Sequence, residues 1–341
     1  MGQHSGPAAT RGTRSPSPDE VADLLRAGAS APSSHNSQPW RLSWTDGAVE
    51  VHGEPSRLLP AADPDGRELR VACGAALANV RLAVRAQGRR AHTQLMPDPD
   101  DRWFLGRVRP GGPLPPSGWE TDLAAAVAHR RTDRHPFSGL PLSAALRDQL
   151  IRAAWREQCR LVIVDGPEER RRLRDLAAEA HRRQRADPAF VAEWERWIGH
   201  GTRVDDGVPQ TQARHEPRPD GAWRLRDFAG VAADGDRDAD VEDPAEEEPL
   251  IAVVATYGDS SLAHVKAGQA MQHVLLTATV RGVAASFVAP PLEIPSIRSR
   301  VRTLLGGVLW PQVVLRLGHG RPVHPTPRRS GAGPVVTRDR P

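Results

Sequence analysis

The chain has 341 residues, of which 39% are hydrophobic, so it can bury a core in one large domain or in two of ordinary size. Its formal charge of +4 comes from 46 Lys and Arg against 42 Asp and Glu. Lys266 is the only lysine, and no zinc-finger, RNP or helix-turn-helix pattern occurs, which disfavours a nucleic-acid binder. No apolar run approaches the roughly 18 residues that span a bilayer, so we expect no membrane partner.

The N-terminal residues 1–18 are polar and rich in proline, and we expect them to form a disordered tail. They contain no hydrophobic signal-peptide core, and Gly6 stands where a myristoylation signal needs Ser or Thr. The two cysteines do not form a disulfide framework, and Cys73 lies in an apolar helical run where a buried thiol is expected. These features indicate a cytoplasmic protein.

Hydrophobic periodicity and turn residues predict the elements before residue 110. A helix begins at Pro18, and a longer one is ended by Gly88. Asp46 and Gly47 are typical of a tight turn between two strands. The predicted elements are a helix over 18–30, a hairpin over 41–44 and 49–53, a helix over 67–87, and strands over 91–96 and 103–109.

The run PGGPLPPSG at 110–118 is predicted to link two parts of the chain. Farther on, residues 200–248 show little periodicity, and 234–248 hold nine acids against one Arg, so we expect a lid or a mobile excursion there. The other expected elements are helices over 119–131, 141–156, 167–186, 188–199, 261–281 and 293–305, and strands over 160–164, 250–257, 284–289 and 313–317.

Two stretches of the chain are repeated with different spacing. Residues 24–28 match 150–154 with an offset of 126, and residues 73–88 match 267–282 with an offset of 194. The second copy is therefore longer by the difference, 68 residues, which fall among the charged helices and the lid candidate. The shared order of helix, strand, long helix and strand predicts two diverged halves. They are a first half over 19–112 and a second half over 119–330, with the lid-like insertion at 200–248.

Familiar catalytic patterns are absent or incomplete. Gly318-His319-Gly320 follows a strand but lacks the third Gly and the helix that a dinucleotide-binding loop needs. The histidines show no HExxH or Cys/His spacing, so no metal is expected. No GxSxG elbow occurs, and no Ser, His and acid stand at a recognisable spacing.

Three other stretches carry polar and basic groups that suit a ligand. APSSHNSQPW (31–40) is either an ordinary turn into a strand or a loop that contacts a ligand. RRTDRHPF (130–137) is either a solvated helix end or a clamp in which arginine forks and the Thr132 hydroxyl bind a phosphate. PTPRRSG (325–331) is either a basic tail or, if it folds back, the completion of that clamp.

These three stretches, in this order, resemble the flavin-binding elements of the nitroreductase superfamily. More closely, the chain from about residue 20 to 330 resembles the actinobacterial Acg-type proteins, FMN binders whose single chain imitates the usual dimer. The likeness includes the long helix from Gly268, the lid-like 206–209 and the acidic-proline stretch 247–249. It implies an α+β, nitroreductase-like fold of two diverged halves, each a central mixed sheet flanked by helices.

The resemblance also implies roles for individual residues. Arg130 and Thr132 would bind the FMN phosphate, with help from Arg328 and Arg329. Arg134 would lie near the pyrimidine edge of the ring. The implied contacts with the ribityl chain and the ring come from Pro32, Ser33, Ser34 and Asn36, and from Ala289 and Pro290, where a neighbour must supply any backbone donor because proline has no N–H.

In ordinary nitroreductases the phosphate-binding element and the Ser-Ser loop belong to different subunits. Here they lie in different halves of one chain, and neither has a second copy, which implies one FMN per chain and a monomer. The implied activity is hydride transfer from NAD(P)H through FMN to a nitroaromatic or quinone-like acceptor. The alternative is an FMN-binding or sequestering protein with little turnover, whose flavin is covered by the lid.

Overall fold

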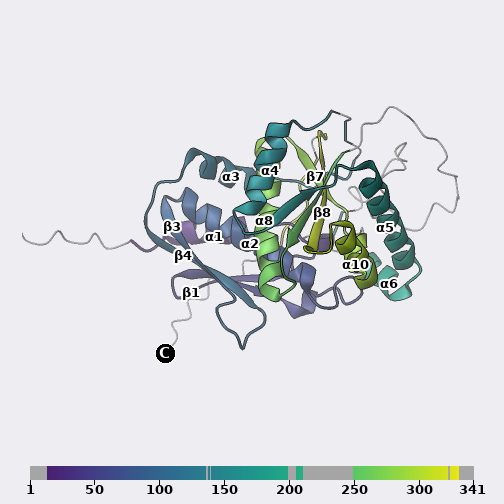
Figure 1. Cartoon of the computed structure of the whole chain (residues 1–341). Coiled ribbons are helices and arrows are strands. Elements are labelled where there is room, and N and C mark those ends of the chain that lie inside the picture. The colour runs from purple at the N-terminus through teal and green to yellow at the C-terminus, as the bar shows by residue number, and fades with distance from the viewer. Residues whose placement is uncertain are drawn as a thin grey trace, which may run out of the picture.

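Two four-stranded antiparallel sheets organise the fold (Figure 1), which we describe from a computed structural model. The first sheet has the order β1-β2-β4-β3 and the second the order β5-β6-β8-β7, so the same arrangement of strands occurs twice. The described residues are 14–135, 137–138, 140–198, 205–209, 249–321 and 323–329. Residues 1–13 of the predicted tail and most of the predicted lid therefore lie outside the described residues.

The elements of the first sheet and its helices follow the prediction closely. Ser17 and Glu20 form a capping box that begins the first helix, and Asp46 and Gly47 adopt the positive φ angles, 49° and 71°, of the predicted hairpin turn. The elements are α1 (Pro18–Ala29), β1 (Trp40–Thr45), β2 (Ala48–Gly53), α2 (Arg67–Ala86), β3 (Arg89–Leu95) and β4 (Phe104–Pro113), with short 3-10 turns at Ser34–Asn36 and Pro55–Arg57.

The remaining elements belong to the second sheet and to the helices around it. Every residue of β6 is buried, as its continuous apolar sequence predicts. The elements are α3 (Gly118–His129), α4 (Ala144–Trp155), β5 (Arg160–Ile163), α5 (Pro167–Arg185), α6 (Pro188–Trp197), β6 (Leu250–Thr256), α8 (Ser261–Val280), β7 (Ala284–Phe287), α9 (Pro290–Glu293), α10 (Pro295–Leu304) and β8 (Trp310–Gly318).

Two predicted boundaries are wrong. The first four residues of the predicted linker, 110–113, continue β4, and Pro113 pairs with Arg89 of β3. The predicted helix over 293–305 is α10, which begins two residues later, because Pro295 suits the first position of a helix, where a missing N–H costs nothing; the short helix α9 before it is not among the predicted elements. None of the described helices is long and apolar enough to cross a membrane.

The long helices α2 and α8 lie side by side between the two sheets (Figure 1). They approach most closely at two glycines: a Cβ on Gly74 would overlap the carbonyl oxygen of Val265, and a Cβ on Gly268 would overlap that of Val71. These four residues are related pairwise by the same offset of 194. The crossing is thus reciprocal, as in a symmetric dimer.

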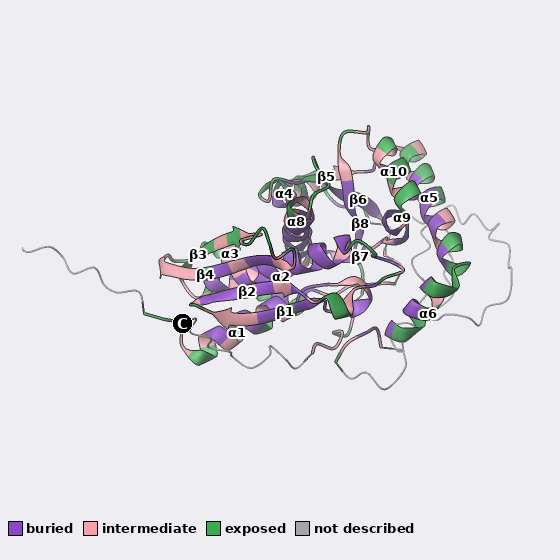
Figure 2. Ribbon diagram, turned by 90° about the horizontal axis from the view of Figure 1, so that it is seen from below, coloured by how far each residue is buried: buried purple, intermediate pink, exposed green. Residues whose placement is uncertain are grey.

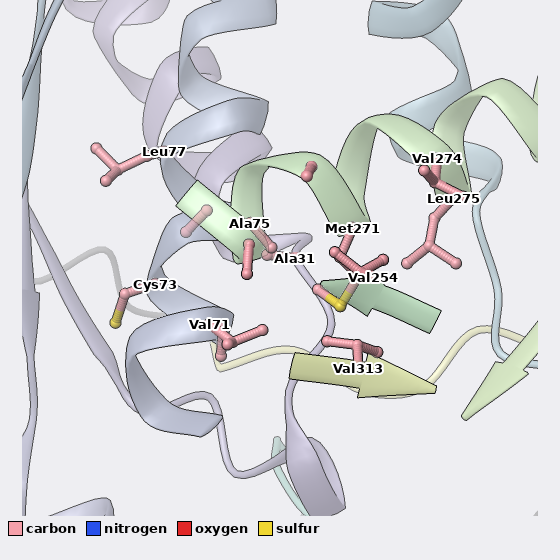
Figure 3. Packing of buried hydrophobic residues seen from close by; sticks show 14 of the residues in the cluster. Ala31, Val71, Cys73, Ala75, Leu77, Val254, Met271, Val274, Leu275 and Val313 are labelled. Atoms are coloured by element: carbon pink, nitrogen blue, oxygen red, sulfur yellow. The ribbon is translucent and has the colours of Figure 1, made fainter. Parts of the chain in front are cut away.

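The main core surrounds this crossing. Val71 of α2, Met271 of α8 and Val313 of β8 belong to one buried cluster, and Cys73 is fully buried in it, as predicted (Figure 3). Burial is greatest on α2, α8 and the strands that they cover, whereas α5 and α6 expose their outer sides (Figure 2). The apolar core therefore lies where the two halves meet.

A buried ionic network also joins the halves. Arg81 of α2 pairs with Glu157, which follows α4, and both contact His273 of α8, with an Arg81 Nη2 to His273 Nε2 distance of 3.2 Å. Burial, with the Arg81 charge nearby, lowers the pKa of His273 to about 4. The imidazole is therefore neutral in the folded chain near neutral pH.

We expect acid to destabilise this network through His273. A buried imidazole whose pKa falls from 6.5 to about 4 contributes stability above pH 6.5 that is lost as the pH falls toward 4. The free energy of unfolding, relative to a His273→Asn variant, should fall by roughly 3 kcal/mol across that range. Asn is the residue at the matching position 79.

Urea unfolding of both chains at pH 7, 6, 5 and 4 measures this difference. The comparison removes the contribution of other titrating groups, such as Asp63, whose carboxyl pKa is raised to about 7 by burial and by Glu68. A difference that stays constant with pH would contradict the assignment.

Candidate functional site

The loop over residues 31–38 has an unusual backbone. His35, Asn36 and Gln38 have φ angles of 53°, 53° and 49°, in the left-handed region that non-glycine residues rarely occupy. The Ser33 hydroxyl supports this bend by accepting a hydrogen bond from the Gln38 N–H at 2.9 Å. Such strain persists only where surrounding contacts hold it, and it is common in ligand-binding loops.

The C-terminal segment 326–329 supplies part of those contacts. The Asn36 amide nitrogen donates to the Pro327 carbonyl at 3.0 Å, and Arg328 Nη1 donates to the Asn36 amide oxygen at 3.0 Å. The Arg329 N–H donates to the Gln38 side-chain oxygen at 2.9 Å. The tail therefore folds back onto the loop, as the clamp interpretation requires.

Residues 205–209, the described part of the predicted insertion, bind the same loop. The Asn36 amide donates to the Gly207 carbonyl at 3.0 Å, and the Gln38 amide donates to the Asp205 carbonyl at 2.8 Å. Arg57 bridges Asp206 and the Ser37 carbonyl. The Asn36 amide nitrogen thus donates to main-chain carbonyls of two different segments, at Gly207 and Pro327, and these bonds position the loop.

Helix α6 extends from the second half to the first. The buried Glu193 carboxylate accepts hydrogen bonds from the N–H groups of Ala61 and Ala62, at 2.9 and 3.0 Å. Trp194 and Trp197 of the same helix pack with Leu59. Because the Val208 N–H donates to the Trp197 carbonyl, this anchor also holds the segment 205–209 near its end.

Four arginines gather beside the loop, and we call Arg130, Arg131, Arg134 and Arg328 the arginine cluster. Arg130 caps α3 and is 4% exposed. Burial and the charges of Arg328, Arg131 and Arg134 lower its pKa to about 9. Burial also lowers the pKa of Arg134 and of Arg328 to about 10. The positive charges of the cluster therefore repel one another around the buried Arg130 guanidinium.

The hydrogen bonds of the cluster leave room for an anion. Arg130 Nε has no hydrogen-bond partner among the described residues, and Arg130 Nη1 reaches the Thr132 hydroxyl only at 3.4 Å. Asp133 is engaged by His135 and by the Arg321 N–H. A buried cation with an unsatisfied donor is costly, so a bound anion would relieve both the repulsion and the lost hydrogen bond.

Arg329 is placed apart from the cluster. Its Nη1 contacts Glu54 at 3.1 Å, and its Nη2 donates to the Trp40 carbonyl at 2.7 Å. The predicted arginine pair is thus divided: Arg328 joins the cluster, whereas Arg329 anchors the tail to the first sheet.

A mostly apolar cavity holds the other predicted residues. It contains about 500 Å³, including its open mouth, and its walls come from both halves. Ala289 lines it, while Pro290 is buried at the start of α9. The lining residues are Pro32, Ser33, Ser34, Glu68, Val71, Ala72, Met271, Phe287, Ala289, Leu292, Gln312, Val313 and Val314.

Glu68, which is not among the residues predicted from the sequence, brings a carboxylate to this cavity. The Ser34 hydroxyl donates to one oxygen, and Arg67 Nη2 contacts the other at 2.9 Å. Arg67 also donates to the carbonyls of Gln312 and Leu292, so the group is fixed against the second half. An acid in the first turn of a helix usually complements the helix dipole, and nothing local in the sequence distinguishes Glu68 from that common role.

The part of the chain that the structure describes contains no group of three or more His, Cys, Asp or Glu side chains arranged to hold a metal ion. The candidate site therefore consists of a partly buried arginine cluster, a strained polar loop and an adjoining apolar cavity. This combination suits a ligand with an anionic end and a flat apolar body.

Comparison with known proteins gives a family match. The model of the nitroreductase family matches residues 127–319. "Putative NAD(P)H nitroreductase Rv3131" of Mycobacterium tuberculosis is 35% identical over 331 residues, which cover 95% of this chain and 93% of that protein. The acg protein of the same organism is 28% identical, covering 91% and 93%. A Desulfitobacterium hafniense nitroreductase solved with bound FMN is 17% identical, covers 60% of this chain and 94% of its own, and has a TM-score of 0.37.

Proposed function

Because this chain belongs to the nitroreductase family and is of the Acg type, we propose that it binds one FMN at the junction of its halves and transfers hydride from NAD(P)H to a nitroaromatic or quinone-like acceptor. The observation that carries this proposal is the arginine cluster around the buried Arg130, whose Nε has no hydrogen-bond partner among the described residues. A phosphate monoester offers a dianion that several neighbouring guanidinium groups can bind.

Different residues of the site would bind different parts of the FMN molecule. Arg130, Thr132 and Arg328 would hold the FMN phosphate, and Arg134 would place a cation near the pyrimidine edge of the ring. Pro32, Ser33, Ser34 and Ala289 would border the ring in the apolar cavity, whose walls exclude water. Bound flavin supplies hydride acceptance and donation, and the chain supplies orientation and electrostatics.

Flavin content and reduction test this proposal. The purified chain should be yellow and contain about one FMN, and anaerobic mixing with NADPH or NADH should bleach the flavin in a stopped-flow experiment. A colourless protein that cannot be loaded with FMN would refute the site. Loaded protein that neither nucleotide bleaches would refute the reductase activity alone.

A flavin-sequestering protein is the second candidate function. The observation that favours it is the attachment of residues 205–209 to the 31–38 loop by Asn36, Gln38 and Arg57. Contacts of this kind would slow the release of a bound flavin and limit access by a second substrate. Slow FMN release without turnover would favour this function over the reductase.

We also propose that the chain acts as a monomer made of two diverged nitroreductase-like halves. The reciprocal crossing at Gly74 and Gly268 and the repeated strand order support this proposal, because they are the contacts expected between the subunits of a symmetric dimer. Sedimentation equilibrium should give the mass of one chain.

A further inference from the structure

A second cavity shares four matching positions with the first, and all of its lining residues lie within 119–330. Gln158 and Cys159 match Pro32 and Ser33 through the offset of 126, and Leu262 matches Glu68 through the offset of 194. Including its open mouth, it contains about 1000 Å³, compared with about 500 Å³ for the first cavity. Its lining residues are Trp155, Gln158, Cys159, Thr256, Tyr257, Gly258, Ser260, Leu262, Ala263 and Lys266.

Exposed apolar side chains converge on this cavity. Trp155 is 54% exposed, Tyr257 59% and Leu262 40%. Six large hydrophobic side chains are exposed in the described part of the chain, and these are three of them. Because an exposed apolar patch of this kind in a soluble chain commonly marks a binding surface, the clustering points to a ligand with an apolar body.

The two aromatic rings are held in place before any ligand arrives. The Arg160 guanidinium carbon lies 4.0 Å from the centroid of the Trp155 ring, and Arg160 Nε donates to the Tyr257 hydroxyl at 2.9 Å. Ordering these side chains in advance lowers the entropy lost on binding. Their flat surfaces suit an aromatic ligand.

The charged group at the cavity is a cation. Lys266, at the position that matches Ala72, donates to the Gln158 side-chain oxygen at 2.7 Å. No acidic side chain is among the lining residues. The pKa of the Cys159 thiol is raised to about 12 by burial and by Glu157, so the thiol is neutral and offers no nucleophile. The polar end of a ligand that fits here is therefore anionic.

We propose that this second cavity binds a small planar aromatic anion, such as an aromatic carboxylate, with its ring against Trp155 and Tyr257 and its charge at Lys266. The ligand is not the flavin, because the arginine cluster has no counterpart here among the lining residues. The site is independent of the proposed FMN site, since the two cavities share no lining residue.

Calorimetric titration of the FMN-saturated chain with 2-naphthoate tests the proposal. One naphthoate should bind per chain, and the neutral analogue 2-naphthalenemethanol should bind about tenfold more weakly, since it lacks the charge. Lys266→Gln should weaken naphthoate about tenfold and leave the neutral analogue unchanged. Trp155→Ala should weaken both.

The control is Arg90→Gln, which removes one exposed positive charge on β3 and should not alter naphthoate binding. Far-UV circular dichroism and FMN content show whether each variant is folded. The proposal fails if naphthoate does not bind at millimolar concentration, if Lys266→Gln binds it normally, or if naphthoate competes with FMN and so occupies the first cavity.

Discussion

Replacing Arg130 with methionine is expected to weaken FMN binding about 100-fold while raising the stability of the flavin-free chain. The affinity falls because two charge-assisted hydrogen bonds to the phosphate, each worth roughly 1.5 kcal/mol or more, are lost. The flavin-free chain becomes more stable because an apolar side chain of similar length replaces a buried cation that lies near three other arginines. Replacement of a whole buried ion pair by apolar residues has been neutral or stabilising by about 1–4 kcal/mol, and here the cation has no acidic partner to lose.

The opposite signs of the two effects distinguish a ligand-binding arginine from a structural one. Fluorescence titration with FMN measures the first effect, and urea unfolding of the flavin-free chain measures the second. Arg90→Met, on the exposed side of β3, is the matched control and should change neither quantity appreciably. A flavin-free Arg130→Met chain that is less stable than the parent would mean that Arg130 simply holds the end of α3.

Gly268→Ala is expected to lower the free energy of unfolding by about 3 kcal/mol or more. The added Cβ would overlap the Val71 carbonyl, so α2 and α8 must separate along the most buried contact of the fold. Gly74→Ala should cost a similar amount, since its Cβ would meet the Val265 carbonyl and lie 3.1 Å from the Gly268 Cα. Chemical denaturation of the parent chain and of the two single variants measures their free energies of unfolding.

A double variant and a matched control sharpen this test. Gly74→Ala with Gly268→Ala should cost less than the sum of the two single changes, because one separation of the helices relieves both overlaps. Gly118→Ala, at the start of α3 with no atom within 4 Å of its added Cβ, should change stability by no more than about 0.5 kcal/mol. Equal effects of Gly118→Ala and Gly268→Ala would contradict the close crossing.

The helices and the hairpin are predictable because neighbouring residues determine them. Ser17 and Glu20 cap α1 reciprocally, and Gly88, with a φ of 71°, ends α2 where a residue with a side chain would be strained. The extension of β4 into residues 110–113 is not predictable in this way. Beyond Val108 that strand pairs with β3 alone, and proline is tolerated where one side of a strand is unpaired.

The candidate site is predictable in its components but not in their arrangement. Short polar residues at 32–36 and arginines at 130–134 indicate a phosphate site, and the structure brings Arg130, Arg328 and the loop together. Whether Arg329 joins them depends on Glu54, 275 residues away in the sequence. The division of the arginine pair is therefore a property of the fold, and no local pattern reveals it.

An enzyme assembled from two identical subunits receives every substitution twice, once in each copy of its site. In this chain Glu68 and Leu262 occupy matching positions but are encoded separately, so a change that suits one cavity leaves the other untouched. The glycine crossing holds α2 and α8 in close contact. A molecule of this kind can retain one ligand and recruit a chemically different one, with no compromise between the two.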